Sequence, residues 1–120
     1  MRRFIAAGFL LCLAACSIGA PPQHVVFFPK GDASLTPDAQ AVVGEIAVAA
    51  RSNPGKVIVE GYEDGGKPQD AALAEERATV VVHELVAAGV ETGRIEKRPA
   101  APAAGVTGVA AHQVTVVIQR

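Results

Sequence analysis

The sequence contains no tryptophan, one tyrosine and four phenylalanines, so aromatic residues make up only 4% of its 120 residues. Because 50% of the residues are nonetheless hydrophobic, we expect a core made of valine, alanine, leucine and isoleucine, within at most one domain. The formal net charge at pH 7 is −1. Since the chain has no excess of basic residues, it lacks the positive surface that drives nucleic-acid binding, and we expect no nucleic-acid partner.

Cysteine is also scarce, and the arrangement of the reactive residue types does not match a catalytic site. Cys12 and Cys16 both lie near the N-terminus, where they cannot cross-link a domain that follows them. His24, His83 and His112 do not have the spacing of metal ligands. The sequence has no Gly-x-Ser-x-Gly motif, no Ser-His-Asp order and no Walker-type loop. We therefore expect a protein that is not an enzyme and that uses no cofactor or metal.

The N-terminus has the pattern of an export signal. Arg2 and Arg3 form a basic start, and the apolar run Phe4–Ala15 has the length of a signal-peptide core, which is too short to span a bilayer comfortably. Leu13–Cys16 then resembles the bacterial lipobox, whose cysteine becomes the lipidated N-terminus. The sequence therefore predicts a lipoprotein signal peptide at 1–15. An ordinary secretory signal cleaved nearby, with an incidental cysteine, is the alternative.

The residues after the cut predict how the chain is anchored. Cys16 carries the lipid in this interpretation, and residues 16–24 form a tether that includes Pro21-Pro22 and is therefore extended. By analogy with bacterial lipoproteins, Ser17 after the cysteine favours sorting to the outer membrane. We expect a lipid-anchored outer-membrane protein whose domain lies in the periplasm.

The stretch from Val57 to Ala78 contains the two charged residues of greatest interest. It is typical of a strand, a short polar turn and the first half of a helix. Asp64 follows the strand, at a position from which a loop carboxylate can face a cleft. Arg77 falls near the edge of the helix's apolar arc, and since an unpaired buried charge is costly, we expect it to have an anionic partner. That arc consists of Leu73, Ala74, Ala78, Val81, Leu85 and Ala88.

Turn and cap residues divide the remainder of the chain. Thr36 is a suitable helix N-cap followed by Pro37, Asn53-Pro54-Gly55 ends that helix, and Gly89 ends the next one. The predicted elements are a strand at Val25–Phe28, a helix from Pro37 to about Ser52, a strand at Lys56–Tyr62, a helix from about Gln69 to Ala88, a strand at Arg94–Lys97, a loop at Pro99–Ala111 and a strand at Gln113–Gln119.

This order predicts an α+β sandwich. A β-α-β-α-β-β chain places two helices on one face of a mixed sheet, and here the whole sandwich is one domain at 25–120. Within the second strand, Val57 and Val59 share one face. Ile58, Glu60 and Tyr62 share the other face, which we expect to be less covered because it is half polar.

Two motifs in the central stretch resemble those of OmpA-like C-terminal domains of the peptidoglycan-associated lipoprotein type. They are Gly61-Tyr62-Glu63-Asp64 and Leu73-Ala74-Glu75-Glu76-Arg77-Ala78. The opening Phe28 followed by Leu35-Thr36-Pro37 is also similar to the start of such domains. The resemblance covers residues 25–120, and it implies the same β-α-β-α-β-β fold.

The resemblance also implies a ligand, which is the diaminopimelate side chain of the peptidoglycan stem peptide. In the family the motif aspartate and arginine hold its amine and its carboxylate, and these residues correspond to Asp64 and Arg77. Asp70 and Tyr62 are further candidates, although Tyr62 equally suits packing on the sheet. From spacing alone, a salt bridge of Arg77 with Asp64 or with Glu60 is the simpler interpretation, whereas the resemblance favours ligand binding.

The chain departs from the family pattern around these two residues. Glu63 stands in place of threonine, Asp70 stands where asparagine is common, and the loop from Asp64 to Arg77 looks shorter than usual. Ala111-His112-Gln113 replaces the usual Asn-Arg-Arg before the last strand, and Pro99–Ala111 replaces a charged glycine-rich loop.

These observations lead to one main hypothesis and one alternative. The main hypothesis is a non-catalytic outer-membrane lipoprotein that tethers the membrane to peptidoglycan by binding diaminopimelate stem peptides. The alternative is a degenerate OmpA-like module that has lost peptidoglycan binding and contacts another envelope protein. An envelope hydrolase has little support, because no nucleophile and base pair can be named.

Overall fold

The computed structural model describes residues 23–63, 67–102 and 112–119, and every structural statement below concerns these ranges. The predicted signal peptide, Cys16, most of the tether and Asp64 lie outside them. The elements are β1 (Gln23–Phe27), α1 (Pro37–Arg51), β2 (Val57–Glu63), α2 (Pro68–Ala87), a 3-10 turn (Thr92–Arg94), β3 (Ile95–Pro102) and β4 (Gln113–Ile118).

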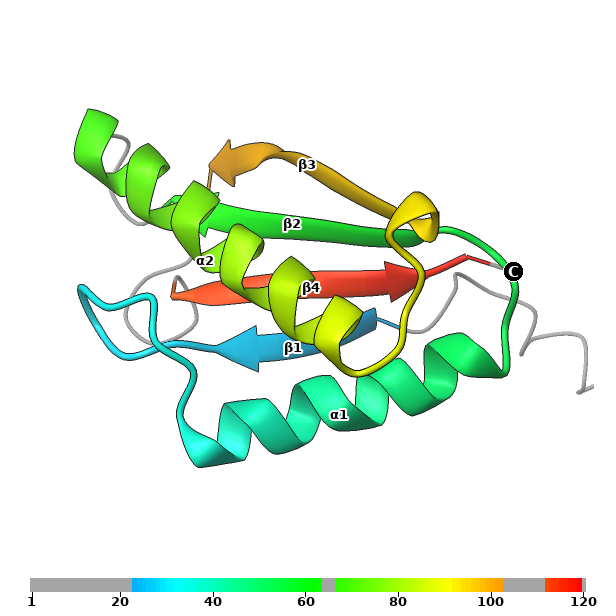
Figure 1. Ribbon diagram of the computed structural model, residues 1–120. Coiled ribbons are helices and arrows are strands. Elements are labelled where there is room, and N and C mark those ends of the chain that lie inside the picture. Colours follow the sequence, from blue (N-terminus) through cyan, green and yellow to red (C-terminus); the bar gives the residue numbers. More distant parts are fainter. Residues whose placement is uncertain (1–22, 64–66, 103–111, 120) are drawn as a thin grey trace, which may run out of the picture.

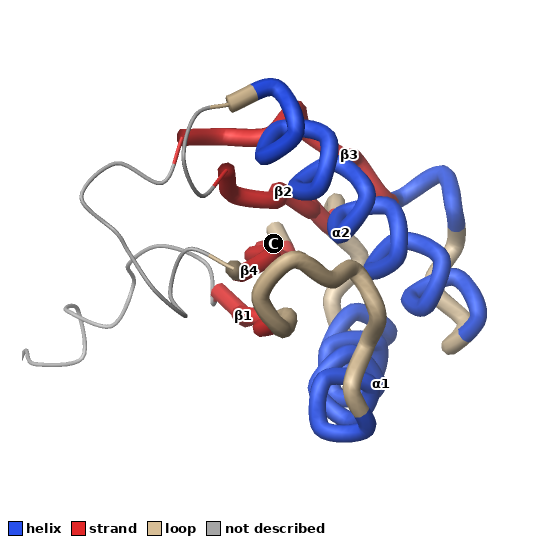
Figure 2. Tube along the Cα trace, turned by 90° about the vertical axis from the view of Figure 1, so that its left-hand side faces the viewer, coloured by secondary structure: helices blue, strands red, loops and turns tan. Residues whose placement is uncertain are grey.

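The strands form one mixed sheet in the order β1-β4-β2-β3. β4 pairs antiparallel with both β1 and β2, whereas β2 and β3 are parallel and are joined by the crossover helix α2. Both helices lie on the same face of the sheet, as Figure 1 and the view turned by 90° in Figure 2 show. The predicted α+β sandwich, with two helices on one face of a mixed sheet, is confirmed.

The core lies between the helices and the sheet, and it is built almost entirely of aliphatic side chains. The inward-facing residues of the central strands alternate as a half-covered sheet requires, and the residues between them face the other side. Val57 and Val59 are fully buried, while Glu60 and Tyr62 on the other face are half-buried, as expected. Ile58 is more covered than its polar neighbours predicted, since it is only 6% exposed. Other members of the core are Val26, Val43, Ile46, Ala78, Val81, Leu85, Val114, Val116 and Ile118.

Local sequence signals determine where the helices begin and end. The Thr36 hydroxyl accepts a hydrogen bond from the Ala39 N–H at 3.1 Å, and Pro37 occupies the first turn, so α1 begins as predicted. Gly89 follows α2 with a φ of 103°, a left-handed conformation that glycine adopts without strain. Both helices end within about one residue of the predicted positions.

A glycine lets α2 lie unusually close to β2. Gly61 is buried, and a Cβ atom added to it would lie 2.3 Å from the Ala74 carbonyl oxygen. Only a residue without a side chain tolerates this approach. Because Ala74 lies one turn before Arg77 on the same helix, this contact fixes the position of Arg77 relative to the end of β2.

The third strand is longer than the sequence predicted. We expected a strand at Arg94–Lys97 and a loop from Pro99, but β3 continues to Pro102 and pairs with β2 up to Glu63. β3 lies at the edge of the sheet, which is where proline is tolerated within strands. The register shifts between Glu60 and Tyr62, which marks a bulge or irregularity.

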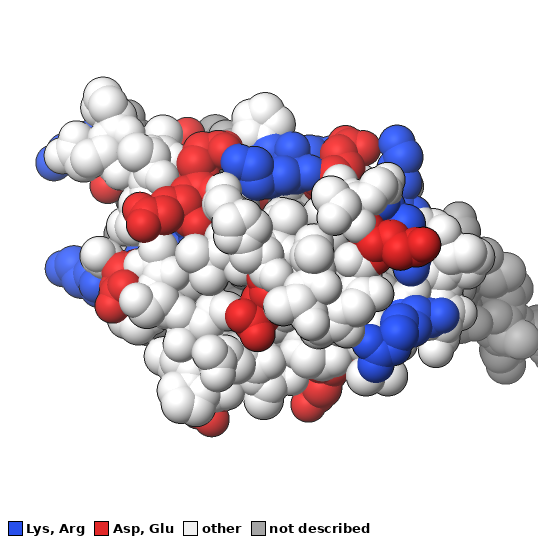
Figure 3. All heavy atoms as spheres, viewed as in Figure 1, with Lys and Arg blue, Asp and Glu red and all other residues white. Residues whose placement is uncertain are grey.

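The described surface carries charges of both signs. In Figure 3, acidic and basic side chains alternate along the upper rim of the helical face. Lys97 pairs with Glu75 at 2.8 Å, and Arg98 pairs with Glu96 at 3.1 Å, both in partly exposed positions. None of the helices among the described residues is long and apolar enough to span a membrane.

Candidate functional site

Several chain segments converge at one end of the sheet. The C-terminal ends of β1 and β2, the N-terminal end of β4 and the first turns of α2 all lie at this end (Figure 1). The loop between β1 and α1 passes over the same region. Residues separated by more than 40 positions in the sequence therefore meet here, and they include Arg77.

Arg77 is the most buried charged residue that the structure describes, with 2% of its surface exposed. Its Nε donates to the Asp32 carbonyl oxygen at 2.8 Å, and its Nη2 donates to the Pro29 carbonyl oxygen at 3.0 Å. The guanidinium also lies over the Phe28 ring, 5.6 Å from the ring centroid, in a cation–π contact. The predicted placement of Arg77 inside the apolar arc is confirmed. Two backbone carbonyl dipoles balance part of its charge.

Asp32 supplies negative charge near this guanidinium. The Ser34 N–H donates to Asp32 Oδ1 at 2.8 Å, and this bond is the main reason why the pKa of Asp32 is lowered from its ordinary value. The Ser34 hydroxyl, the Ala33 N–H and the positive charge of Arg77 lower this pKa further. Asp32 is therefore ionised at neutral pH, in the same loop as Lys30.

A small polar cavity of about 140 Å³ opens beside Arg77. It brings together an acid, a guanidinium, an amine and an imidazole, because its lining includes Asp70 and Arg77 from α2, Lys30 from the β1–α1 loop and His112 just before β4. Gly31 and Leu73 complete the described lining. One Asp70 carboxylate oxygen, Oδ2, accepts the Lys67 N–H at 3.1 Å, so that acid also caps α2.

Of the predicted site residues that the structure describes, two line the cavity and one does not. Arg77 and Asp70 share the cavity, whereas Tyr62 is half-buried opposite Ala101 of β3 and does not line it. Asp64 lies outside the described residues, so its part in the site stays a prediction. Within the described ranges, no group of three or more His, Cys, Asp or Glu side chains could hold a metal ion.

Sequence reasoning missed two members of the cavity lining, Lys30 and His112. Lys30 lies in a turn with no motif to single it out. From the sequence, His112 is notable only as a histidine without metal-ligand spacing and as a departure from the family's Asn-Arg-Arg. The available signal was its position next to the last strand, because the starts and ends of neighbouring antiparallel strands meet at one edge of the sheet.

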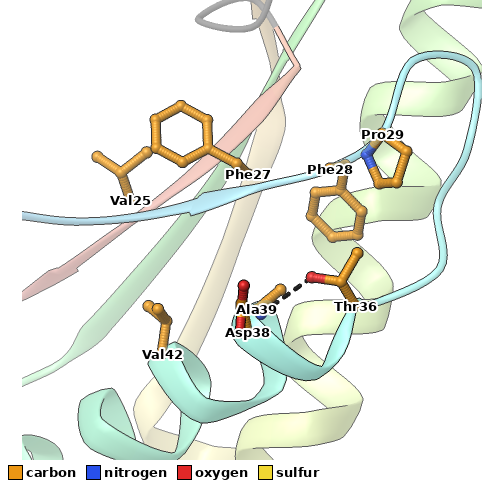
Figure 4. A pocket seen from close by; sticks show the side chains of 8 residues that line it. All are labelled: Val25, Phe27, Phe28, Pro29, Thr36, Asp38, Ala39 and Val42. Atoms are coloured by element: carbon orange, nitrogen blue, oxygen red, sulfur yellow. Dashed lines mark hydrogen bonds between the residues drawn. The ribbon is translucent and has the colours of Figure 1, made fainter.

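A larger cavity of about 300 Å³ lies between β1 and α1 and differs in chemistry. Its lining is mainly apolar, with Asp38 as the one charged residue among the described lining residues. Figure 4 shows the β1 side chains and the start of α1 around it. None of the predicted site residues lines this cavity, so we place the candidate site at the smaller, charged one, although Phe28 borders the larger cavity and also contacts Arg77.

Comparison with protein families decides the classification. The model of the OmpA family matches residues 27–115, which include both helices and the cavity residues Lys30, Asp70, Arg77 and His112. This chain belongs to the OmpA family. A search of curated proteins gave no match to this chain.

Solved structures share the same OmpA fold at low sequence identity. The OmpA-like domain of FopA1 from Francisella tularensis subsp. tularensis SCHU S4 matches with a TM-score of 0.71 and 16% identity, over 80% of this chain and 70% of that one. The peptidoglycan-associated lipoprotein from Burkholderia pseudomallei matches with a TM-score of 0.66 and 23% identity, over 80% and 90% of the two chains. The cell wall anchor of the T6SS from Pseudomonas aeruginosa has a TM-score of 0.64 and 22% identity, over 82% of each chain. At these identities the matches establish the OmpA-like fold of this chain.

Proposed function

We propose that this protein is a non-catalytic lipoprotein that tethers the outer membrane to peptidoglycan by binding diaminopimelate stem peptides. In this proposal Cys16 carries the lipid anchor and the OmpA-like domain lies in the periplasm. Membership of the OmpA family supports the proposal, as does the similarity to a peptidoglycan-associated lipoprotein and a cell wall anchor. The observation that carries it is Arg77, a buried guanidinium that lines a small cavity together with an acid.

The ligand chemistry fits the charges of the site. The diaminopimelate side chain ends in an amine and a carboxylate on one carbon, so a binding site needs an acid and a cation within a few ångströms of each other. Arg77 supplies the cation, and Asp70 supplies one acid at the cavity. Asp64, which follows β2 in the sequence, is the acid that we propose binds the amine of the ligand. Charge-assisted hydrogen bonds of this kind are each worth about 1.5–3 kcal/mol.

The bonds of Arg77 also define how a ligand carboxylate reaches it. The side of the guanidinium that presents Nε and Nη2 is occupied by the carbonyl oxygens of Asp32 and Pro29. Any carboxylate, whether from this chain or from a ligand, therefore meets the guanidinium at its Nη1–Nη2 end. The two carbonyls and the Phe28 ring hold that end in a fixed orientation, which lowers the entropy lost on binding.

The same contacts favour a second candidate function. A guanidinium that is 2% exposed and braces a loop through two carbonyl oxygens also serves as a structural element. In that case the chain is a degenerate OmpA-like module that has lost peptidoglycan binding and contacts another envelope protein. The two candidates differ in what replacement of Arg77 removes: ligand binding and stability in the first, stability alone in the second.

Co-sedimentation with purified diaminopimelate-type sacculi, with thermal melts of the same proteins, separates the candidates. Arg77→Lys keeps the charge but loses the planar fork, and Asp64→Asn keeps the shape but loses the charge. Each change should weaken sacculus binding by about tenfold or more, since a charge-assisted bond is lost.

Arg94→Lys is the matched control for the loss of hydrogen bonds from an arginine to loop carbonyls. Arg94 also holds a loop through backbone carbonyls, donating to the Gly55 oxygen from Nε at 3.2 Å and from Nη2 at 2.9 Å, and to the Asn53 oxygen. It does not line the cavity. Arg94→Lys should therefore lower the melting temperature and leave binding unchanged. If Arg77→Lys only lowers the melting temperature in the same way, the structural candidate is correct.

A further inference from the structure

The first strand lies at an edge of the sheet. Within the described ranges, β4 is the only strand that pairs with β1. The Phe28 N–H donates to the His112 carbonyl oxygen at 2.8 Å, in line with the β1–β4 register. Because hydrogen bonding alternates along an antiparallel pair, the N–H and C=O groups of Val25 and Phe27 point away from β4. This side of β1, which we call its open edge, is a template on which another extended chain can pair.

The apolar cavity of about 300 Å³ borders this open edge. Its lining includes Val25, Phe27 and Phe28, together with residues at the start of α1. Figure 4 shows Phe28 directed toward the start of α1 and Phe27 directed away from it, as the alternation of a strand requires. Since β4 covers the other side of the strand, the cavity contacts both faces of β1 along its open edge. Phe27 is 48% exposed, so a large apolar side chain lies in water here.

We propose that the open edge of β1 docks an extended segment of a partner protein. The segment adds a strand to the four-stranded sheet through main-chain hydrogen bonds to Val25 and Phe27, and it places an aliphatic or aromatic side chain in the cavity. Asp38 is the one charged residue among the described lining residues, so it favours a segment that carries a lysine or arginine beside that side chain. This inference goes beyond the proposed function and does not depend on it.

The position of α1 favours a single segment over a second copy of this chain. In both Figure 1 and Figure 2, α1 lies beyond β1, past the edge of the sheet. A second copy that paired through its own β1 would bring its own α1 onto the same face, where the two helices would compete for one space. A single extended segment brings no helix with it and meets no such obstacle.

The test uses two synthetic peptides that alternate threonine and valine around a central phenylalanine. They differ only in the residues that flank the phenylalanine, which are lysines in one and glutamates in the other. Binding to the full chain, purified in nonionic detergent, is measured by fluorescence anisotropy at constant ionic strength. The lysine peptide should bind at least about threefold more tightly than the glutamate peptide, because Asp38 is exposed and exposed charge pairs are weak.

Hydrogen exchange shows whether the peptide pairs with the strand. When the lysine peptide binds, the N–H groups of Val25 and Phe27 should exchange more slowly, because new main-chain bonds protect them. The Val26 N–H already faces β4 and should change little, so it is an internal control. NMR resolves these amides one by one.

Two variants isolate the contribution of Asp38. Asp38→Asn should remove the preference for the lysine peptide, whereas the matched control Glu45→Gln should keep it. Glu45 is an exposed acid of the same helix that does not line the cavity, so both variants lose one negative charge. Thermal melts show whether each variant is folded, because an acid in the first turn of α1 also stabilises that helix. Sacculus binding should be the same in both variants as in the unmodified protein.

Three results would overturn the inference. The first is a lysine peptide that does not bind. The second is protection of the Val25 and Phe27 amides as strong as that of Val26 in the chain without peptide, because another part of this chain or a second copy then occupies the open edge. The third is a preference for the lysine peptide that persists in Asp38→Asn. Each leaves the proposed function standing, and a chain that fails to bind sacculi leaves this inference standing.

Discussion

Replacing Gly61 with alanine tests how the fold positions Arg77. The added Cβ would lie 2.3 Å from the Ala74 carbonyl oxygen and 3.0 Å from the carbonyl carbon, whereas ordinary contact begins at 3.4 Å. The obstacle is helix backbone, which cannot rotate away as a side chain can, so α2 must retreat by about 1 Å, the difference between these distances.

The expected cost follows from this displacement. Overpacking that shifts backbone typically costs about 1–3 kcal/mol, and each kcal/mol lowers the melting temperature of a domain of this size by about 4–8 °C. Gly61→Ala should therefore melt at least about 4 °C below the unmodified protein in a circular-dichroism scan. Because Arg77 moves with the helix, sacculus binding should fall as well.

Gly44→Ala is the matched control, since it makes the same chemical change at a different site. Gly44 lies within α1, and a Cβ there would meet nothing within 4 Å. Alanine is the better helix former, so the free energy of unfolding of this variant should rise by about 0.5–1 kcal/mol. Gly61→Ala should thus lower the free energy of unfolding, whereas Gly44→Ala should raise it. A Gly61→Ala protein that melts at or above the temperature of the unmodified protein would refute the close approach of α2 to β2.

Three further predictions concern the core, the loop charge and the anchor. Leu85→Ala should lower the free energy of unfolding by about 2–5 kcal/mol, because Leu85 is fully buried. His83→Ala, on the exposed face, should lower it by no more than about 0.5 kcal/mol. Equal losses would mean that α2 does not bury the face that carries Leu85. Asp32 has a lowered pKa in the folded chain, so its contribution to stability is present above the unfolded value of about 3.9 and is lost as the pH falls through the folded value. The stability difference between the unmodified protein and Asp32→Asn should therefore shrink in urea titrations from pH 5 to pH 2, and a difference that stays constant would contradict this. Cys16→Ser should abolish acyl labelling and leave an uncleaved precursor or a soluble species, whereas unchanged labelling and membrane fractionation would disprove lipidation at Cys16.

Local signals explain why most of the fold was predictable. Thr36 and Pro37 mark the start of α1 through a side-chain bond and a fixed φ, and both act within a few residues of the chain. The apolar arc of α2 likewise follows from helical periodicity, which by itself predicts that Arg77 lies on the buried side of the helix, as it does.

The features that were not predictable depend on contacts between distant parts of the chain. The carbonyl partners of Arg77 lie 45 and 48 residues away, at Asp32 and Pro29, and no local pattern indicates a backbone acceptor. β3 extends to Pro102 because β2 offers it a parallel edge, although proline and alanine have low strand propensity. The cavity also depends on contacts between distant parts of the chain, since its lining residues Lys30 and His112 lie far apart in the sequence.

The most direct test of the proposed function compares two kinds of sacculi that differ by one carboxylate. Diaminopimelate-type and lysine-type stem peptides share the side-chain amine, but only the first has the carboxylate that Arg77 is proposed to bind. The full chain should co-sediment with diaminopimelate-type sacculi and bind lysine-type sacculi at least about tenfold more weakly, the loss of one charge-assisted bond. A chain that stays in the supernatant with both, or that binds both equally, would contradict the account.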